Sequence, residues 1–360
     1  MNTPTYLLEK ASGLDVVALL PAHIGFTPQD SIVVGAVHPP RGRLGVVVRL
    51  DRLRADRDVL RELAAGRADW LRQSGARASF LVRYAPPGAE AVEEDEAFWV
   101  WADVLGERLP VIGCWDVMGE AHQELDPAAR RRIGPVFGPQ DLQSTRAAAT
   151  LALAGLAPKA RREDLARIEL APEAARKAAR AAQLRARDQT LALGPEQLRG
   201  WRLAGLEVWA RWQRRLLQRP GAAVPPSQLG RLAALLADQV ARDAVMASAF
   251  VGAGEAPKRI VCGGDASALF DPWASRGVDQ DLADASLDLL TQVASHLTPR
   301  RRGAVYALGA TWHWWCGNGP AAEEWARAAM DCHDCPQLAA LVLAVLEREI
   351  FPAALQRLAA

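Results

Sequence analysis

The sequence is poor in lysine and cysteine and contains no long hydrophobic run. Lysine occurs only at Lys10, Lys159, Lys177 and Lys258, so arginine carries nearly all of the basic charge. With 43 basic and 42 acidic residues the formal net charge is +1, which argues against a general polyanion binder. Five cysteines, an odd number spread over a long chain, do not form the pattern of a disulfide framework. We therefore expect a reducing, cytoplasmic location.

Several sequence features of membrane proteins and of common enzymes are missing as well. No apolar run reaches the roughly 18 to 20 residues that a membrane span needs, and Met1 to Thr5 does not begin a signal peptide. The sequence has no phosphate-binding glycine loop, no His-Glu-x-x-His zinc motif and no Gly-x-Ser-x-Gly elbow. We expect no membrane association and no cofactor, and the pattern leans away from catalysis.

What is present indicates two parts, because 360 residues exceed one ordinary core. For residues 1–137 the sequence predicts an α/β domain with a mixed sheet, in the order β-β-α-β-α-β. The strands are predicted at Ser31 to Val37, Leu44 to Leu50, Ala78 to Tyr84 and Pro110 to Val117, with helices at Arg57 to Gln73 and Glu90 to Arg108. The expected sheet is covered by these helices.

Residues 138–360 predict an all-α domain, since apolar residues recur there at helical spacing and several helices begin at proline. The segment 251–277 has five glycines and is expected to be irregular. Residues 302–349 predict a hairpin similar to a tetratricopeptide repeat. Its pattern consists of an aromatic residue, a turn glycine and small packing residues at His313, Gly317, Ala322, Ala326 and Ala329.

The stretch from Pro21 to Ser31, which leads into an Ile/Val strand, resembles the N-terminal signature of the actinobacterial domain of unknown function 4192 family. Further similarities lie at 154–165, at Arg242-Asp243 and from Trp312 to Gly319, so the resemblance covers nearly the whole chain. It implies the two-part fold and an actinobacterial host, and it implies no particular activity.

The Pro21 to Ser31 stretch is the first candidate site. Gly25 permits close backbone approach to a ligand, and Asp30 and Ser31 are expected beside a pocket at the edge of the sheet. The alternative is structural: the prolines and Gly25 shape a turn, and Asp30 or Ser31 caps backbone N–H groups. No general base lies nearby in the sequence, which favours the structural interpretation.

Cys332 and Cys335 flank His333-Asp334 and form the second candidate site. Two thiolates at this spacing bind zinc or act as a redox pair in many proteins. Zinc needs four ligands, and the nearest further candidates, His313 and Cys316, precede this motif by one helix. A cysteine is also a common small apolar filler, so we expect these two residues to hold no metal.

The third candidate is an arginine-rich region from 176 to 219, which contains eleven basic and three acidic residues. Arg211, Arg214, Arg215 and Arg219 follow Trp201, Trp209 and Trp212 on one predicted helix. Arginines between aromatic rings can neutralise phosphates and stack on bases, but helical spacing favours a buried tryptophan stripe with arginines facing solvent. The six aspartates of the acidic segment 265–288 offer an internal partner for this charge.

Together these patterns favour a non-catalytic scaffold or regulatory protein that binds another protein through its helical half. One alternative is an enzyme or a nucleotide or small-molecule binder with a site at the sheet edge near residues 21–31. A second alternative is nucleic-acid binding through residues 176–219, which the sequence allows but which we do not expect.

Overall fold

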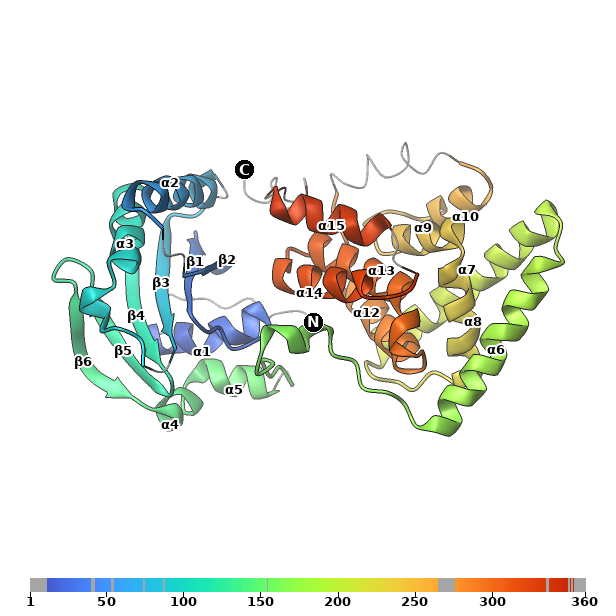
Figure 1. Ribbon diagram of the computed structural model, residues 1–360, viewed down its shortest axis with the longest axis horizontal. Helices are drawn as coiled ribbons and strands as arrows, with labels where there is room; N and C mark the ends of the chain where they lie inside the picture. Colours follow the sequence, from blue (N-terminus) through green and yellow to red (C-terminus); the bar gives the residue numbers. More distant parts are fainter. Residues whose placement is uncertain are drawn as a thin grey trace. The chain divides into compact units, whose positions relative to one another are not determined.

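The computed structural model describes residues 12–39, 43–52, 55–73, 75–86, 88–153, 155–264, 276–334, 337–348, 350 and 352. The chain divides into two compact units. Among the described residues, one unit extends from residue 12 to 162 and contains the sheet, and the other begins at residue 163 and is helical (Figure 1).

The first unit is built on one six-stranded sheet with the order β2-β1-β3-β4-β5-β6. Its strands are β1 (Ser31–His38), β2 (Arg43–Asp51), β3 (Ala78–Ala85), β4 (Val111–Met118), β5 (Ala121–Asp126) and β6 (Arg131–Phe137). β3 and β4 are parallel, and the other neighbours are antiparallel. The sheet is therefore mixed, as the sequence predicts.

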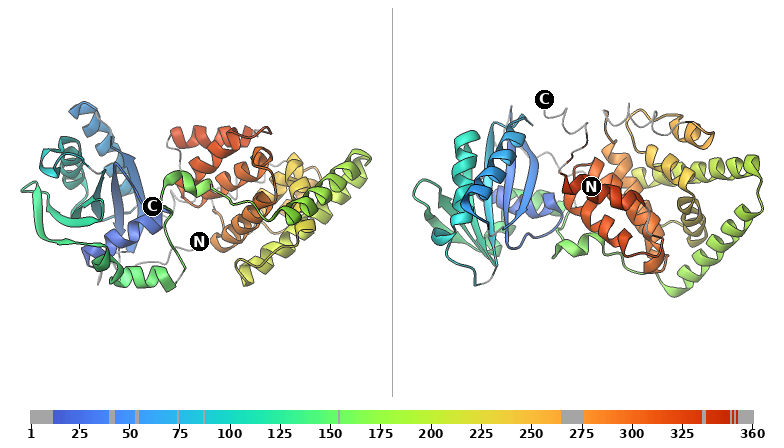
Figure 2. Two further views of the ribbon diagram at one scale, coloured as in Figure 1. Left: turned by 60° about the horizontal axis from the view of Figure 1, so that its bottom comes forward. Right: turned by 45° about the horizontal axis from the view of Figure 1, so that its top comes forward.

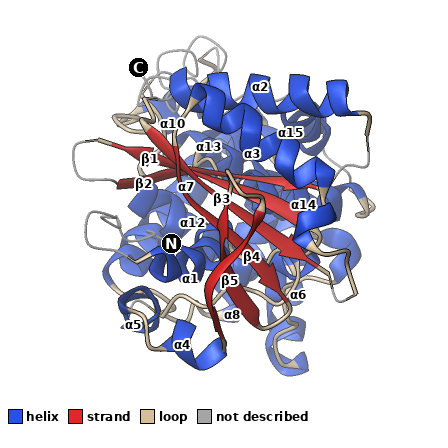
Figure 3. Cartoon of the chain, turned by 90° about the vertical axis from the view of Figure 1, so that its left-hand side faces the viewer, coloured by secondary structure: helices blue, strands red, loops and turns tan. Residues whose placement is uncertain are grey.

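Helices lie on both faces of this sheet (Figure 3). On one face α2 (Arg57–Gln73) and α3 (Glu96–Arg108) pack on alternate residues of the strands, including Ile32, Val34 and Leu81. The opposite face carries α1 (Gly13–Ile24), where Leu20 lies beside Gly35 and the backbone of Gly13 lies against the Trp115 ring. Because helices cover both faces of the sheet, its central strands are apolar on both faces.

Helix α1 is absent from the order predicted from the sequence. Ser12 and Asp15 form a reciprocal capping box at its start, and Gly25, with a φ of 95°, ends it in a left-handed conformation. Pro21, which the sequence analysis assigned to a turn, lies in the last turn of the helix. A proline inside a helix removes one backbone hydrogen bond and crowds the carbonyl four residues earlier, and α1 ends three residues after Pro21.

The sheet has two more strands than the sequence predicts, because β5 and β6 are largely polar and lack an apolar run. After them, α4 (Pro139–Gln143) and α5 (Arg146–Leu153) remain with the sheet unit. Ala147 and Leu151 of α5 pack on Leu19 of α1. The compact unit thus ends at Arg162, whereas the sequence pattern changes at 137.

The second unit consists of helices around one large core. They are α6 (Glu173–Leu191), α7 (Pro195–Gln218), α8 (Pro226–Ala237), α9 (Gln239–Ala247), α10 (Ala256–Val261), α12 (Gln280–Ser295), α13 (Gly303–Trp315), α14 (Gly319–Met330) and α15 (Gln337–Glu347). Trp209 and Trp312 are fully buried, and their ring centroids are 6.0 Å apart. Figure 2 shows α6 and α7 as the longest helices of the unit.

The segment 251–277 contains the short helix α10, and residues 265–275 of it lie outside the described part. Within 302–349, α13 and α14 pack against each other across the turn at Gly317, and Gly309 on α13 lies against the Trp325 ring of α14. None of the helices in the described part of the chain combines the length and apolarity needed to span a bilayer.

Candidate functional site

The carboxyl ends of the parallel strands β3 and β4 carry a buried charge network. Arg83, near the end of β3, is fully buried and lies opposite Asp116 of β4 in the sheet register. Its Nε donates to Asp95 Oδ2 at 2.6 Å, its Nη1 donates to Asp116 Oδ1 at 3.0 Å, and its Nη2 donates to the Glu90 carbonyl at 2.9 Å. All three directions of the guanidinium are therefore satisfied.

Two further arginines extend this network toward solvent. Arg52 Nε lies 3.1 Å from Asp95 Oδ2, and its terminal nitrogens contact Glu90 and lie 3.7 Å from Asp30. On the other side, Arg132 of β6 donates to Asp116 Oδ2 at 2.7 and 3.1 Å and to Glu93 at 3.2 Å. Ligands of α/β sheets bind at this end of the strands, but here a guanidinium holds every carboxylate of the network.

Gly25, Asp30 and Ser31, the candidate residues near 21–31, have three different structural roles. Gly25 caps α1, and its carbonyl accepts a hydrogen bond from the backbone N–H of Lys159 at 2.8 Å. Asp30 has a φ of 42°, a conformation that Asp adopts more readily than most residues, and its carboxylate joins the charge network through Arg52. Ser31 begins β1 and is completely buried.

Ser31 and Tyr84 are paired across β1 and β3, so their side chains share the sheet face that is opposite to Arg83. Neither hydroxyl has a hydrogen-bond partner among the described residues. Burial raises the pKa of Tyr84 far above its ordinary value, so the phenol is protonated and available only as a neutral donor or acceptor. Since β1 lies between β2 and β3, Ser31 is at the end of an interior strand and not in an edge strand.

The charge network was not predicted, although the sequence contains one signal for it. Arg83 interrupts the apolar run of β3, and Asp116 interrupts that of β4. Charged residues are almost never fully buried unless they are paired. An arginine and an aspartate in two predicted interior strands are thus a signal for a buried pair, although the partner on the loop, Asp95, cannot be identified from spacing.

Arg211, Arg214, Arg215 and Arg219 lie on the solvent face at the C-terminal end of α7, and all four are exposed. The opposite face of the helix buries Leu206, Trp209, Gln213 and Leu216. Arg215 lies over the Trp212 ring, 5.2 Å from its centroid. We call the four exposed arginines the α7 arginine stripe. Of the three tryptophans expected in a buried stripe, Trp209 is fully buried, whereas Trp201 and Trp212 are only partly buried.

Within the described residues, no carboxylate forms an ion pair with the α7 arginine stripe. The acidic helix α12 does pack beside α7, but through other contacts. Gln213 Nε2 donates to Ser286 Oγ at 2.7 Å, Asp288 accepts from the Gly221 N–H at 2.8 Å, and Asp279 caps its own helix. Asp265 and Asp271 lie outside the described residues.

Cys332 is buried, and its thiol contacts the carbonyls of Ala328 and Pro299 at 3.2 and 3.4 Å. Burial raises the pKa of this thiol, which favours the neutral form over the thiolate that zinc requires. Cys335 lies outside the described residues. In the part of the chain that the structure describes, no three His, Cys, Asp or Glu side chains come together as metal ligands.

Comparison with known protein families identifies a match. A family model described as a domain of unknown function, DUF4192, matches residues 14–263, which is more than half of the chain. The matched region includes the charge network and the α7 arginine stripe. No curated protein and no solved structure matches this sequence.

Proposed function

We propose that this chain, which belongs to the DUF4192 family, is a non-catalytic binding protein whose helical unit docks an acidic protein surface on the α7 arginine stripe. The observation that carries the proposal is the stripe itself. Arg211, Arg214 and Arg215 lie at positions i, i+3 and i+4 of α7, and Arg219 follows as its C-cap residue; all four are exposed, and no carboxylate pairs with them among the described residues.

Another arginine of the same helix shows how such a guanidinium is held by a carboxylate. Arg202, two turns earlier on α7, is held by both carboxylate oxygens of Asp238 at 2.8 and 2.9 Å. A planar guanidinium favours two parallel hydrogen bonds to a carboxylate. The terminal nitrogens of the stripe arginines can make the same kind of contact with carboxylates of a partner surface.

A protein partner fits the charge of the whole chain better than a nucleic acid. Affinity for nucleic acid grows with the number of neutralised phosphates, and nucleic-acid-binding domains are typically strongly basic. Here the net charge is +1, and Glu207, which is also exposed, stands one turn before Arg211 on the same side of α7. Four arginines beside one glutamate are complementary to a small protein surface that is mainly acidic and also carries a basic group.

We further propose a cellular location and a role for the helix pair α13–α14. We place the protein in the cytoplasm, because Cys114, Cys262, Cys316 and Cys332 are free thiols, as in proteins of reducing compartments. We also treat α13 and α14 as a tetratricopeptide-like pair that supports the helical unit. Close packing of small residues against Trp325 is the contact that favours this comparison.

The decisive variant replaces Arg211, Arg214, Arg215 and Arg219 with glutamine. Wild type and variant are compared for partners retained from nuclease-treated host lysate, and then for direct binding to each purified candidate at several salt concentrations. We expect acidic proteins that the variant loses, with wild-type affinity that falls as salt rises. Stability should change by less than about 0.5 kcal/mol, because all four sites are exposed.

A matched control replaces Arg180, Arg185, Arg231 and Arg259, which are exposed arginines of the same unit, and removes the same charge. Equal losses in the two fourfold variants would show that net charge alone matters and would refute the stripe as a site. Sub-micromolar binding of a DNA or RNA oligonucleotide at physiological salt, weakened only by the stripe variant, would show that the partner is a nucleic acid.

A further inference from the structure

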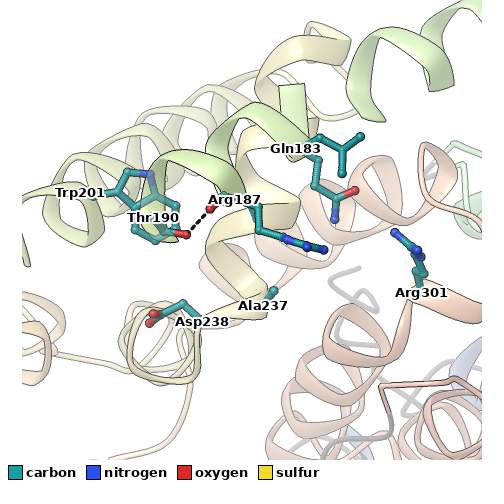
Figure 4. A pocket seen from close by; sticks show the side chains of 9 residues that line it. Gln183, Arg187, Thr190, Trp201, Ala237, Asp238 and Arg301 are labelled. Atoms are coloured by element: carbon teal, nitrogen blue, oxygen red, sulfur yellow. Dashed lines mark hydrogen bonds between the residues drawn. The ribbon is translucent and has the colours of Figure 1, made fainter. Parts of the chain in front are cut away.

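The helical unit contains a cavity of about 240 Å³ that lies away from the α7 arginine stripe. Its lining comes from the C-terminal half of α6, the start of α7, the end of α8 and the 3-10 turn Pro299–Arg301. Figure 4 shows the side chains that face it. Five of the nine lining residues are polar or charged, and the apolar part of the wall comes from Leu184, Trp201 and the alanines of α8. The cavity is open to solvent, since Arg187 and Arg301 are both exposed.

Three hydrogen-bond donors converge in this cavity. Arg187 from α6 and Arg301 from the 3-10 turn extend toward each other, and the side-chain amide of Gln183 points into the space between them (Figure 4). Neither guanidinium forms an ion pair within the described residues. Two cations that face one another repel, and an anion between them turns this repulsion into attraction.

The one carboxylate in the lining does not supply that anion. Asp238 is held by Arg202 through two hydrogen bonds of 2.8 and 2.9 Å, and it also caps α9 by accepting from the Ala241 N–H. In Figure 4 its carboxylate points away from Arg187 and Arg301. The remaining polar side chain is that of Thr190, whose hydroxyl donates to the Arg187 carbonyl at 2.6 Å. The Thr190 hydroxyl oxygen can therefore only accept a further hydrogen bond.

From this geometry we propose that the cavity binds the phosphoryl group of a small phosphate monoester. A tetrahedral dianion accepts hydrogen bonds in several directions at once, which matches two guanidiniums and one amide from separate elements. The volume lies below the roughly 300–1,000 Å³ of drug-sized sites. It accommodates the phosphoryl group with a small substituent, and the Trp201 ring provides an apolar surface for that substituent.

The proposal is tested by calorimetric titration of the full chain at physiological salt with phenyl phosphate and, separately, with inorganic phosphate. We expect phenyl phosphate to bind more tightly, since only the ester reaches both the arginines and Trp201. Benzoate, a planar monoanion with the same ring, should bind at least tenfold more weakly than phenyl phosphate. Equal affinities for phosphate and phenyl phosphate would identify a free-phosphate site.

The variant Arg187→Gln/Arg301→Gln should weaken phenyl phosphate binding at least tenfold, because charge-assisted hydrogen bonds are the strongest contacts in the site. Arg180→Gln/Arg185→Gln removes the same charge from exposed positions outside the cavity and should leave the affinity within about twofold. Arg187→Lys/Arg301→Lys retains the charge and should give an intermediate loss, which also controls for folding. No binding by the wild type, or equal losses in both glutamine variants, would overturn the proposal.

Discussion

Arg83 shares its charge between two buried carboxylates, Asp95 at the start of α3 and Asp116 on β4. Arg83 thus connects the start of α3 to the neighbouring strand β4. The Asp95 carboxylate also caps α3, because it accepts a hydrogen bond from the Phe98 N–H. A buried ion pair contributes little net stability compared with apolar residues of the same shape, but the loss of one partner leaves an uncompensated buried charge.

Replacement of Arg83 with methionine should therefore lower the free energy of unfolding by about 3–5 kcal/mol. Urea denaturation followed by tryptophan fluorescence measures this. Arg57→Met is the matched control, since the Arg57–Glu96 pair is exposed at both ends, and it should cost less than about 1 kcal/mol. The triple change Arg83→Met, Asp95→Asn and Asp116→Asn should recover part of the loss. Equal effects of the two single variants would contradict the assignment.

His313 is a second residue whose environment has a measurable consequence. It packs edge-on against the Trp325 ring, with centroids 5.3 Å apart, and burial lowers its pKa from 6.5 to about 3. The folded state therefore keeps this histidine neutral, while the unfolded chain binds a proton below pH 6.5. Stability from this group is complete above that pH and is lost as the pH falls from 6.5 toward 3.

Wild-type protein should lose up to about 1.4 kcal/mol of unfolding free energy per pH unit below 6.5 through this histidine. His313→Phe keeps a ring beside Trp325 and removes the titration, so the dependence between pH 7 and pH 5 should become shallower. Urea midpoints at several pH values compare the slopes. Burial also lowers the pKa values of His23 and His122, so some slope remains in the variant. Parallel curves for the two proteins would rule out the neutral His313.

At the scale of elements, the contact between α6 and α8 depends on the absence of a side chain. A Cβ at Gly230 of α8 would lie 2.0 Å from the Ala179 carbonyl oxygen of α6. Small residues at Ala179, Ala182 and Ala186 form the α6 side of this contact. The helices thus approach more closely than larger side chains allow, and they hold Gln183 and Arg187 at the cavity.

Gly230→Ala should destabilise the chain by about 1–3 kcal/mol, because two backbones would have to move apart. Gly200→Ala is the control with the opposite sign. Nothing lies within 4 Å of a Cβ at Gly200, which is also inside a helix, so alanine there should stabilise by about 0.4–1 kcal/mol. Thermal unfolding of the two variants measures both effects. A stabilised Gly230→Ala variant would show that the close approach is not required.

At the scale of the whole molecule, the point where the chain passes from one unit to the other has a practical consequence. α4 and α5 follow the last strand, and α5 buries Ala147 and Leu151 against α1. A backbone bridge between Phe26 and Lys159 ties the following loop to the same unit. Residues 138–162 thus pack with the sheet, although their sequence is helical like that of the second unit.

A fragment from residue 138 to the end should accordingly be less soluble than the full chain, since it carries α5 without the helix that covers its apolar face. A fragment from residue 163 retains the complete core of the helical unit and should be the better behaved of the two. Sedimentation and cooperative melting of both fragments test this. A soluble, monomeric, cooperatively melting fragment from residue 138 would contradict the expectation.

The family, the two-part organisation and the solvent face of α7 followed from the sequence, because each depends on local pattern. The motif at Pro21 to Ser31 lies at the start of the matched family region. The β-branched runs predicted β1 to β4, and helical spacing predicted the buried Leu216, whereas Trp201 and Trp212 of the same expected stripe are only partly buried. The strands β5 and β6 were not predicted, because they are largely polar. Backbone hydrogen bonds to neighbouring strands hold them in the sheet, and such bonds leave no apolar pattern in the sequence.

Only the tertiary structure decided which charged residues meet. Arg83 and Asp116 are 33 positions apart and become neighbours through sheet register. Arg187 on α6 and Arg301 on the 3-10 turn Pro299–Arg301 are separated by several helices, and they line one cavity only in the folded chain. Sequence spacing specifies how one helix or strand divides into faces. The pairing of faces is set by burial and close packing of the whole chain, and the buried charge network and the cavity both depend on that pairing.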